Sequence, residues 1–280
     1  MYRIVKKEAL KPTVILYEIE APMVAKKAQP GQFIILRVDE NGERIPITIH
    51  DYDREKGTVT IIVQTVGATT EKLSHKQQGE CLHDFVGPLG RPTETEGKKK
   101  VCVVGGGVGC AITYPVLKKF HDCGAEVHAV VGFKNKDVVI LEDKFKAVSS
   151  VLKVCTDDGS YGQKGLVTEA LKELLDAGNV YDEIFAIGPM IMMKFVSKTT
   201  EPYGVPTPVS MSPIMIDGTG MCGGCRLTVG GETKFACVDG PDFDGHQVDW
   251  DLAVKRNQMY RDFELRKHEE VCNLYKQEVK

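Results

Sequence analysis

The chain has 280 residues, of which 42% are apolar, which suffices for a buried core and for two or three domains. The formal net charge is −3, and the Lys and Arg residues are spread along the chain, which argues against nucleic acid as a partner. The first residues lack the apolar stretch of a secretion signal, and no run approaches the roughly 18 apolar residues of a membrane span. We therefore expect a cytoplasmic protein that binds no membrane.

Residues 1–97 predict a small antiparallel β-barrel. Runs rich in β-branched residues at 14–19, 33–38 and 58–63 have the length of strands, and turn signals at 29–32, 41–42 and 56–57 separate them. The charged and polar segment 93–100 predicts a domain boundary near residue 97.

The strand-like segment that contains Arg44, Pro46, Ile47 and Thr48 is the first candidate ligand site. An Arg can pair with a diphosphate through two N–H groups, Thr offers a hydroxyl, and Pro fixes the backbone beside a planar ring. The alternative is that Arg and Thr only form the solvated face of a strand.

A second candidate is the loop formed by Val66, Gly67, Thr69 and Thr70, which leads into a predicted helix. Backbone N–H groups at a helix N-terminus can hold a phosphate, although a Thr at this position is also an ordinary helix cap. Gly87 begins the sequence Gly-Pro-Leu-Gly, which we expect to form a rigid turn that closes this domain.

Residues 98–209 alternate between strands and helices. Strands are expected at 101–104, 126–131, 150–155 and 183–187, and helices at 111–121 and 166–177. This order predicts a parallel sheet that is covered on both faces.

Glycine-rich turns follow these strands and mark a candidate nucleotide site. A glycine turn between a strand and a helix lets a diphosphate approach the backbone. The usual dinucleotide fingerprint is incomplete, because Cys110 replaces its Gly or Ala and no ribose-binding acid follows at the usual distance. The candidates, each after a predicted strand, are Gly105, Gly106, Gly107, Val108 and Gly109, then Asp157 and Asp158, then Gly188, Pro189 and Met190.

Three of the nine cysteines have the spacing of metal ligands: Cys222, Cys225 and Cys237. Asp217 is the only acid or imidazole between residues 210 and 225, so it is the candidate for the fourth ligand, although Asp-Gly is also a common turn pair. The segment 210–249 is too short for a core of its own, which a metal centre could replace. The other cysteines are expected to be structural: Cys81, Cys102, Cys110, Cys123, Cys155 and Cys272.

Taken in order, these motifs resemble the ferredoxin–NADP reductase superfamily over residues 1–249. The closest likeness is to the branch that contains the electron-transfer subunit of dihydroorotate dehydrogenase and the small subunit of NADH-dependent ferredoxin:NADP oxidoreductase. The resemblance implies FAD on the barrel, NAD(H) on the parallel sheet, and a [2Fe-2S] cluster held by the segment 210–249. Asp217 stands where the dihydroorotate subunit has the first of its four cysteine ligands. An Asp with three Cys resembles instead the small subunit of the ferredoxin:NADP oxidoreductase.

The resemblance also implies a function without a catalytic acid or base: NADH reduces FAD, and single electrons pass through the cluster to a partner. That partner would be a larger flavin and iron–sulfur subunit that resembles the small subunit of glutamate synthase, uses NADP(H) and ferredoxin, and bifurcates electrons in a heterodimer. NADH is favoured if Asp157 or Asp158 repels a 2′-phosphate, whereas Lys134 would attract one.

Residues 250–280 predict a terminal helix, which we interpret as the clamp for that partner or as a helix that packs on its own domain. Its expected contacts are Trp250, Leu252, Tyr260, Phe263 and Leu265. Two other functions stay open. One is the electron-transfer subunit of a dihydroorotate dehydrogenase or a sulfhydrogenase, and the other is a non-catalytic nucleotide-binding module with a structural zinc.

Overall fold

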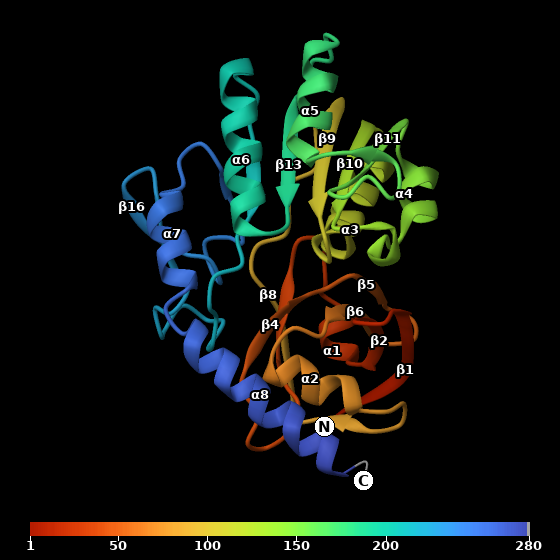
Figure 1. Ribbon diagram of the computed structural model, residues 1–280, viewed down its shortest axis with the longest axis vertical. Helices are drawn as coiled ribbons and strands as arrows, with labels where there is room; N and C mark the ends of the chain where they lie inside the picture. Colours follow the sequence, from red (N-terminus) through yellow and green to blue (C-terminus); the bar gives the residue numbers. More distant parts are fainter. Residues whose placement is uncertain (279–280) are drawn as a thin grey trace.

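The structure is a computed structural model that describes residues 1–278, with side chains through residue 275. A β domain, a parallel α/β sheet and a C-terminal region follow one another along the chain, and the last helix returns to the first domain (Figure 1).

Two antiparallel sheets enclose the core of the N-terminal domain. The larger sheet has the order β5-β6-β2-β1-β7 and the smaller one the order β4-β3-β8. Both sheets bury aromatic and aliphatic side chains such as Tyr17, Ile34 and Phe85 against each other, so the predicted antiparallel barrel is confirmed. The elements are β1 (Tyr2–Lys11), β2 (Val14–Glu20), α1 (Pro22–Ala25), β3 (Phe33–Arg37), β4 (Ile45–Thr48), β5 (Asp51–Asp53), β6 (Thr58–Gln64), α2 (Ala68–His75), β7 (Cys81–Leu82) and β8 (Asp84–Leu89).

The rigid turn that we expected at Gly87 is wrong, because Gly87 lies inside β8. A side chain at this position would meet Ile34 at 2.6 Å, so only a glycine lets β8 approach β3 this closely. The register between β3 and β8 shifts between Phe33 and Ile35, opposite the Gly-Pro pair. This irregularity accommodates a proline within the ladder.

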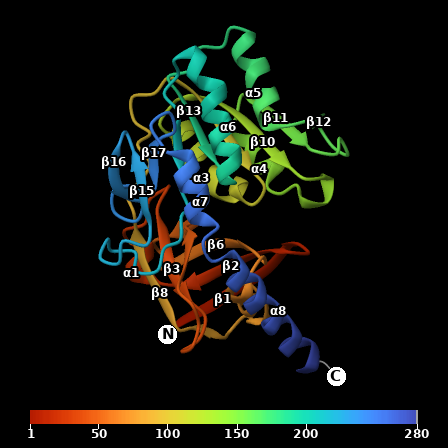
Figure 2. The same ribbon diagram turned by 60° about the vertical axis from the view of Figure 1, so that its left-hand side comes forward.

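The second sheet has the order β12-β11-β10-β9-β13-β14-β17, and all neighbours are parallel except β14 and β17. Helices α3 and α4 share a core with one face, and α5 and α6 share a core with the other (Figure 2). The predicted parallel sheet is therefore confirmed. The elements are β9 (Lys100–Gly106), α3 (Gly109–Asp122), β10 (Glu126–Phe133), α4 (Glu142–Val148), β11 (Val151–Thr156), β12 (Gln163–Lys164), α5 (Val167–Asp176), β13 (Glu183–Ile187), α6 (Met190–Thr200) and β14 (Pro208–Ser210), with single 3₁₀ turns at Lys136–Val138 and Glu201–Tyr203.

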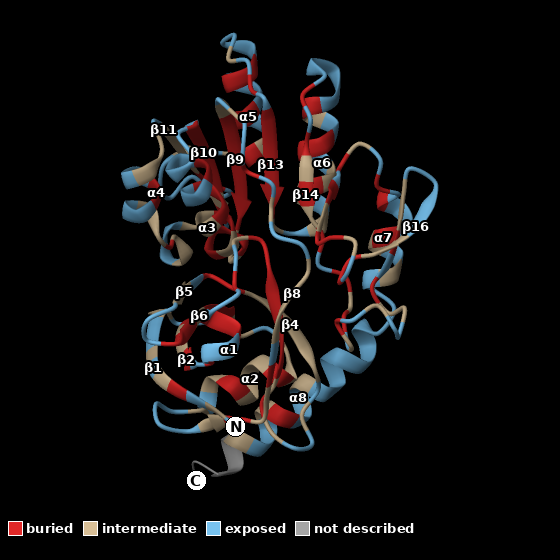
Figure 3. Ribbon diagram, turned by 180° about the vertical axis from the view of Figure 1, so that it is seen from behind, coloured by how far each residue is buried: buried red, intermediate tan, exposed pale blue. Residues whose placement is uncertain are grey.

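The C-terminal region joins the core of the parallel sheet. It contains the hairpin β15 (Arg226–Val229) and β16 (Glu232–Phe235), the edge strand β17 (Asp242–Asp244), and the helices α7 (Trp250–Asn257) and α8 (Arg261–Glu278). Figure 3 shows that β9, β10 and β13 of the parallel sheet are largely buried. Leu227 and Ala236 are buried in the same cluster as residues of α5 and α6. The segment therefore shares an apolar core that its own length would not supply.

The terminal helix that we expected is present as α8, but the segment from Trp250 onward forms two helices instead of one. The helical path breaks between Asn257 and Arg261, and α8 then crosses over α2 of the first domain (Figure 1). A second correction concerns Cys123, which is exposed, whereas Cys102, Cys110 and Cys155 are buried as expected. Within residues 1–278, no helix is long and apolar enough to cross a membrane.

Candidate functional site

A pocket of about 340 Å³ lies where the two domains meet. On the sheet side it follows β9 and β13, the neighbouring strands at which the order of the sheet reverses. Ligands of open α/β sheets bind at this point, outside the carboxyl ends of the strands. The pocket brings together eight of the residues predicted from sequence: Pro46, Thr48, Gly106, Gly107, Val108, Gly109, Gly188 and Pro189.

Close backbone packing explains two of these glycines. A side chain at Gly109 would lie 2.8 Å from the α-carbon of Gly188 and 2.9 Å from the carbonyl oxygen of Ile187. The two turns after β9 and β13 therefore touch through bare backbone. Gly107 has a φ of +58°, and its N–H donates to the carbonyl of Gly132 at 2.8 Å. These constraints hold the turns in place beside the pocket.

Sequence reasoning missed about half of the pocket. Several of the missed residues lie at or just after the end of β14. Because β14 also ends at the carboxyl edge of the sheet, the position of this segment in the chain was the signal that could have identified them. The missed residues are Phe33, Gln64, Ile112, Ile187, Ser210, Met211, Ser212, Met215 and Pro241.

The other predicted residues lie outside this pocket. Met190 begins α6 directly after the pocket turn, and Gly105 precedes the other turn within β9. Asp157 and Asp158 follow β11 at the same edge of the sheet, two strands away from β9, and both are exposed. Hydrogen bonds from Ser160 lower the pKa of Asp158, so its carboxylate is ionised at neutral pH. The remaining residues outside the pocket are Arg44, Ile47, Val66, Gly67, Thr69, Thr70 and Gly87.

The start of α2 lies beside the segment that contains Arg44. Thr69 donates its hydroxyl to the carboxylate of Glu43 at 3.0 Å, which joins the two candidate flavin segments. The Thr70 hydroxyl accepts hydrogen bonds from the backbone N–H groups of Val66 and Gly67, both at 2.9 Å. Gly67 is the N-cap of α2 and Thr70 is the third residue of the helix, so the simpler interpretation of a Thr at the N-cap is wrong. The N–H groups of the first helical turn are the ones that could hold a phosphate.

Two of the three predicted thiols are in contact. The sulfur atoms of Cys225 and Cys237 lie 3.3 Å apart, and both residues are buried. Burial and the adjacent Cys225 thiol raise the pKa of Cys237 to about 12. A thiol with a raised pKa binds as a thiolate only beside a cation, which is the environment that a metal centre supplies. The chemistry of this pair thus fits a metal.

The third thiol and the predicted carboxylate lie at the surface of the same loop. Cys222 is exposed, and its sulfur accepts the N–H of Gly224 at 3.4 Å. Oxygen Oδ2 of Asp217 accepts hydrogen bonds from the hydroxyl and N–H of Thr219, at 2.6 and 2.9 Å, and from the N–H of Met221 at 3.2 Å. The Thr219 bonds lower the pKa of Asp217, so the carboxylate is charged. Among the described residues nothing bonds to Oδ1, which stays available for a metal.

Arg44 connects this loop to the barrel. Its Nε donates to the carbonyl of Ile216 at 2.8 Å, and its Nη1 pairs with Asp84 at 3.0 Å. Two residues after Ile216, the α-carbon of Gly218 packs so closely on β3 and β8 that an added side chain would meet Leu89 at 2.7 Å. The loop with three of the four predicted metal ligands, Asp217, Cys222 and Cys225, therefore rests directly on the domain that carries the candidate flavin segments.

The predicted partner contacts divide into two groups. Trp250 is buried, and its indole N–H donates to the carbonyl of Gly245 at 2.9 Å, so the prediction that it binds a partner is wrong. Its large apolar ring stabilises the region's own core instead. Leu252, Tyr260, Phe263 and Leu265 are exposed on α7, α8 and the segment between them.

Comparison with known proteins relates both the C-terminal region and most of the chain to one family. A family model described as the iron–sulfur cluster binding domain of dihydroorotate dehydrogenase B matches residues 212–249. A protein of Thermotoga maritima, described as a dihydroorotate dehydrogenase B (NAD(+)) electron transfer subunit homolog, is 49% identical over 261 residues, which are 93% of this chain and 92% of that protein. The dihydroorotate dehydrogenase B electron transfer subunit of Desulforamulus reducens is 33% identical over 248 residues, which are 86% of this chain and 94% of that protein.

Solved structures give the same result for the fold. A chain of an NADH-dependent reduced ferredoxin-NADP oxidoreductase, described in relation to flavin-based electron bifurcation, has a TM-score of 0.91 and 47% identity, and the match covers 96% of this chain and 97% of that one. The ferredoxin reductase of a carbazole 1,9a-dioxygenase has a TM-score of 0.61 and 16% identity over 73% of this chain and 65% of that one, which shows the fold alone. The chain therefore belongs to the dihydroorotate dehydrogenase B electron-transfer subunit family of the ferredoxin–NADP reductase superfamily, and is an NAD(P)H oxidoreductase subunit with an iron–sulfur binding domain.

Proposed function

We propose that this subunit oxidises NADH and delivers single electrons to a larger flavin and iron–sulfur subunit that uses NADP(H) and ferredoxin. When bound, FAD accepts a hydride from NADH and yields electrons one at a time, and a [2Fe-2S] cluster passes them on. The observation that carries the proposal is the contact between Arg44 and Ile216, because it joins the candidate flavin segment to the loop of the candidate cluster ligands.

The pocket supports a role in positioning the nicotinamide. Pro46 and Thr48 on the barrel face Gly106 and Gly109 on the sheet across the same space. A nicotinamide held by the two glycine turns would thus be presented to a flavin on the barrel. Hydride transfer depends on close stacking, and these residues supply geometry rather than acid–base chemistry. We accordingly propose no catalytic acid or base.

The sulfur geometry favours a binuclear cluster over zinc. Tetrahedral zinc with Zn–S distances of about 2.3 Å needs every pair of ligand atoms about 3.8 Å apart. Cys225 and Cys237 come near this separation at 3.3 Å, but within the described chain the predicted ligands do not form a group of three with all distances within 4.8 Å. In a binuclear cluster each iron takes two protein ligands, so only the two ligands of the same iron have to be this close together. We propose Cys225 and Cys237 on one iron, and Cys222 with Asp217 on the other.

The exposed apolar residues around this loop support a docking face. Met221, next to Cys222, is 88% exposed, and Phe263 on α8 is 67% exposed. Arg256 near the end of α7 donates to the carbonyl of Gly224 at 3.3 Å, so α7 and the cluster loop lie side by side. A partner on this face would bring its acceptor next to the cluster, which is where an electron has to leave.

Anaerobic purification of the full chain tests the proposal. We expect FAD, two irons and two sulfides per chain. NADH should bleach both the flavin and the cluster spectra, and it should do so faster than NADPH. A colourless protein with bound zinc would overturn the redox function in favour of the structural-zinc alternative.

A pull-down of the natural partner tests the docking face. Phe263→Glu should weaken binding of the partner while NADH still reduces the isolated subunit, because the residue is remote from the pocket. Val180→Glu is the matched control, since Val180 is 82% exposed at the opposite end of the parallel sheet. Identification of the captured subunit and assays with dihydroorotate decide between this function and a role in dihydroorotate dehydrogenase or sulfhydrogenase. Equal binding by both variants would place the interface elsewhere.

A further inference from the structure

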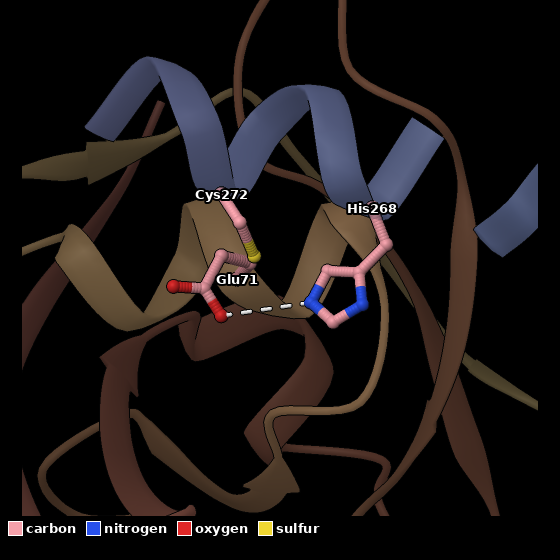
Figure 4. A group of neighbouring side chains, drawn as sticks. All are labelled: Glu71, His268 and Cys272. Atoms are coloured by element: carbon pink, nitrogen blue, oxygen red, sulfur yellow. Dashed lines mark ion pairs between the residues drawn. The ribbon is translucent and has the colours of Figure 1, made fainter. Parts of the chain in front are cut away.

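One face of α8 packs on α2, and it carries the chemistry of a metal site. His268, Val271, Cys272 and Tyr275 lie at positions i, i+3, i+4 and i+7, which share one side of a helix. Val271 is buried in this contact, while the two ligand-type residues on either side of it are partly buried. Figure 4 shows His268 and Cys272 pointing from α8 toward Glu71 on α2.

The three side chains converge on one point. One ligand atom from each of Glu71, His268 and Cys272 lies within 4.8 Å of the other two. Oxygen Oε2 of Glu71 and Nε2 of His268 are 3.8 Å apart, which is too long for a hydrogen bond. The same Nε2 is shielded from solvent and has no hydrogen-bond partner in the described part of the chain. A shielded ring nitrogen without a partner calls for an occupant, because leaving it unsatisfied destabilises the fold.

The donor set selects the kind of occupant. Imidazole, thiolate and carboxylate are together the ligands of zinc, with bond lengths of about 2.0–2.3 Å. Tetrahedral geometry with these bonds sets the ligand atoms about 3.3–3.8 Å apart. The observed separations approach this range, so small side-chain rotations would close the site. Three protein ligands leave a fourth position for water.

A neighbouring histidine holds the carboxylate in place. Nε2 of His75 lies 3.3 Å from Oε1 of Glu71, the oxygen that does not face His268. The ring of His75 also stacks on Tyr275, with ring centres 3.7 Å apart and an angle of 15° between the planes. Carboxylate ligands commonly have such a second partner, which orients them toward the metal. His75 is thus a positioning residue.

We propose that Glu71, His268 and Cys272 bind a zinc ion that fastens the terminal helix α8 to α2. The site is separate from the candidate cluster loop, which lies before α7 in the chain. The metal would have a structural role. It would join residues almost 200 positions apart in the chain and hold α8, the helix that carries Phe263, against α2. A partly exposed ion pair between Glu71 and His268 would add little stability by itself.

The test measures zinc in the full chain after equilibrium dialysis against buffered zinc. Elemental analysis should find one more zinc per chain in the wild type than in His268→Ala and in Cys272→Ser, with equal iron in all samples. The iron measurement separates this site from loss of the cluster, whose empty thiols would also take zinc. His121→Ala and Cys123→Ser are matched controls, because they remove exposed residues of the same two types far from α8 and should keep the extra zinc.

Two further measurements distinguish a metal site from a structural contact. His75→Phe should keep the stack on Tyr275 but weaken zinc affinity about 10–100-fold, as expected for an orienting partner. Added zinc should slow tryptic release of the α8 peptide several-fold in the wild type. The effect of zinc should be smaller in Glu71→Asp and absent in Cys272→Ser. Equal zinc content in the wild type and both ligand variants, or zinc-independent proteolysis of the wild type, would overturn the proposal.

Discussion

A buried carboxyl group on the edge strand β17 predicts a specific pH dependence of stability. Oδ2 of Asp242 accepts the hydroxyl of Thr93 at 2.6 Å, whereas Oδ1 is shielded from solvent and has no hydrogen-bond partner in the described chain. Burial raises the pKa of Asp242 to about 7 from its ordinary 3.8. Above neutral pH, folding therefore forces a charge into a site that solvates it poorly.

The sign follows from the two pKa values. The pKa of the folded state is the higher one, so this group favours the folded state most below about pH 4 and loses that contribution as pH rises to about 7. The full shift corresponds to an upper limit of about 4 kcal/mol. Because the residue as a whole is only partly buried, solvent screens part of this penalty. We expect the loss of unfolding free energy between about pH 5 and pH 8 to be roughly 1–2 kcal/mol from this group.

Asp242→Asn isolates the effect, because the amide stays neutral at every pH. Its NH₂ group would still lack a partner, which destabilises the variant by about 1–3 kcal/mol at all pH values. As pH rises, the apparent midpoint of thermal unfolding should therefore fall less in the variant than in the wild type. The difference should be about 2–4 °C for each kcal/mol of unfolding free energy that the wild type loses through Asp242. Asp244→Asn is the control, since Asp244 is on the same strand but exposed. Parallel pH profiles for Asp242→Asn and the wild type would refute the reasoning.

Three further predictions concern the site and its support. Asp217→Ala should lower the iron content or shift the cluster potential, and full iron with an unchanged potential would mean that another group is the fourth ligand. Gly109→Ala should weaken NADH binding and stability together, because its methyl group meets the backbone of Gly188; calorimetric titration with unchanged affinity would contradict this. Trp250→Ala should destabilise the protein by about 3–5 kcal/mol in chemical denaturation without reducing the NADH reaction of the folded protein.

The sequence was sufficient for elements with a strong pattern. Helix α5 places Val167, Leu171 and Leu174 on one buried face, and this periodicity predicted it almost to the residue. Strand β1 was not predicted individually, because apolar and charged residues do not alternate regularly along it and few of its residues are buried. The break between α7 and α8 was missed because the residues 258–260 contain no Gly or Pro, and packing on α2 decides the direction of α8.

The site was predictable where one rule of parallel sheets applies. The turns at Gly106 and Gly188 follow different strands, and the carboxyl ends of parallel strands meet at one edge, so the sequence order already implied that they converge. No such rule relates Arg44 to Ile216, or Glu71 to His268. Those contacts depend on how separate units pack, which local periodicity does not record.

Arg44 shows why the contact with the cluster loop and a role in holding a diphosphate are compatible. A guanidinium has five N–H donors in a fixed plane. Nε and Nη1 are used by the carbonyl of Ile216 and the carboxylate of Asp84, which leaves donors on the other edge of the group for a phosphate. Because the group is planar and rigid, a ligand that orients it would also set the position of the loop that follows Ile216. The same side chain would then couple occupancy of the flavin segment to the placement of Asp217, which explains why an arginine rather than a lysine suits this position.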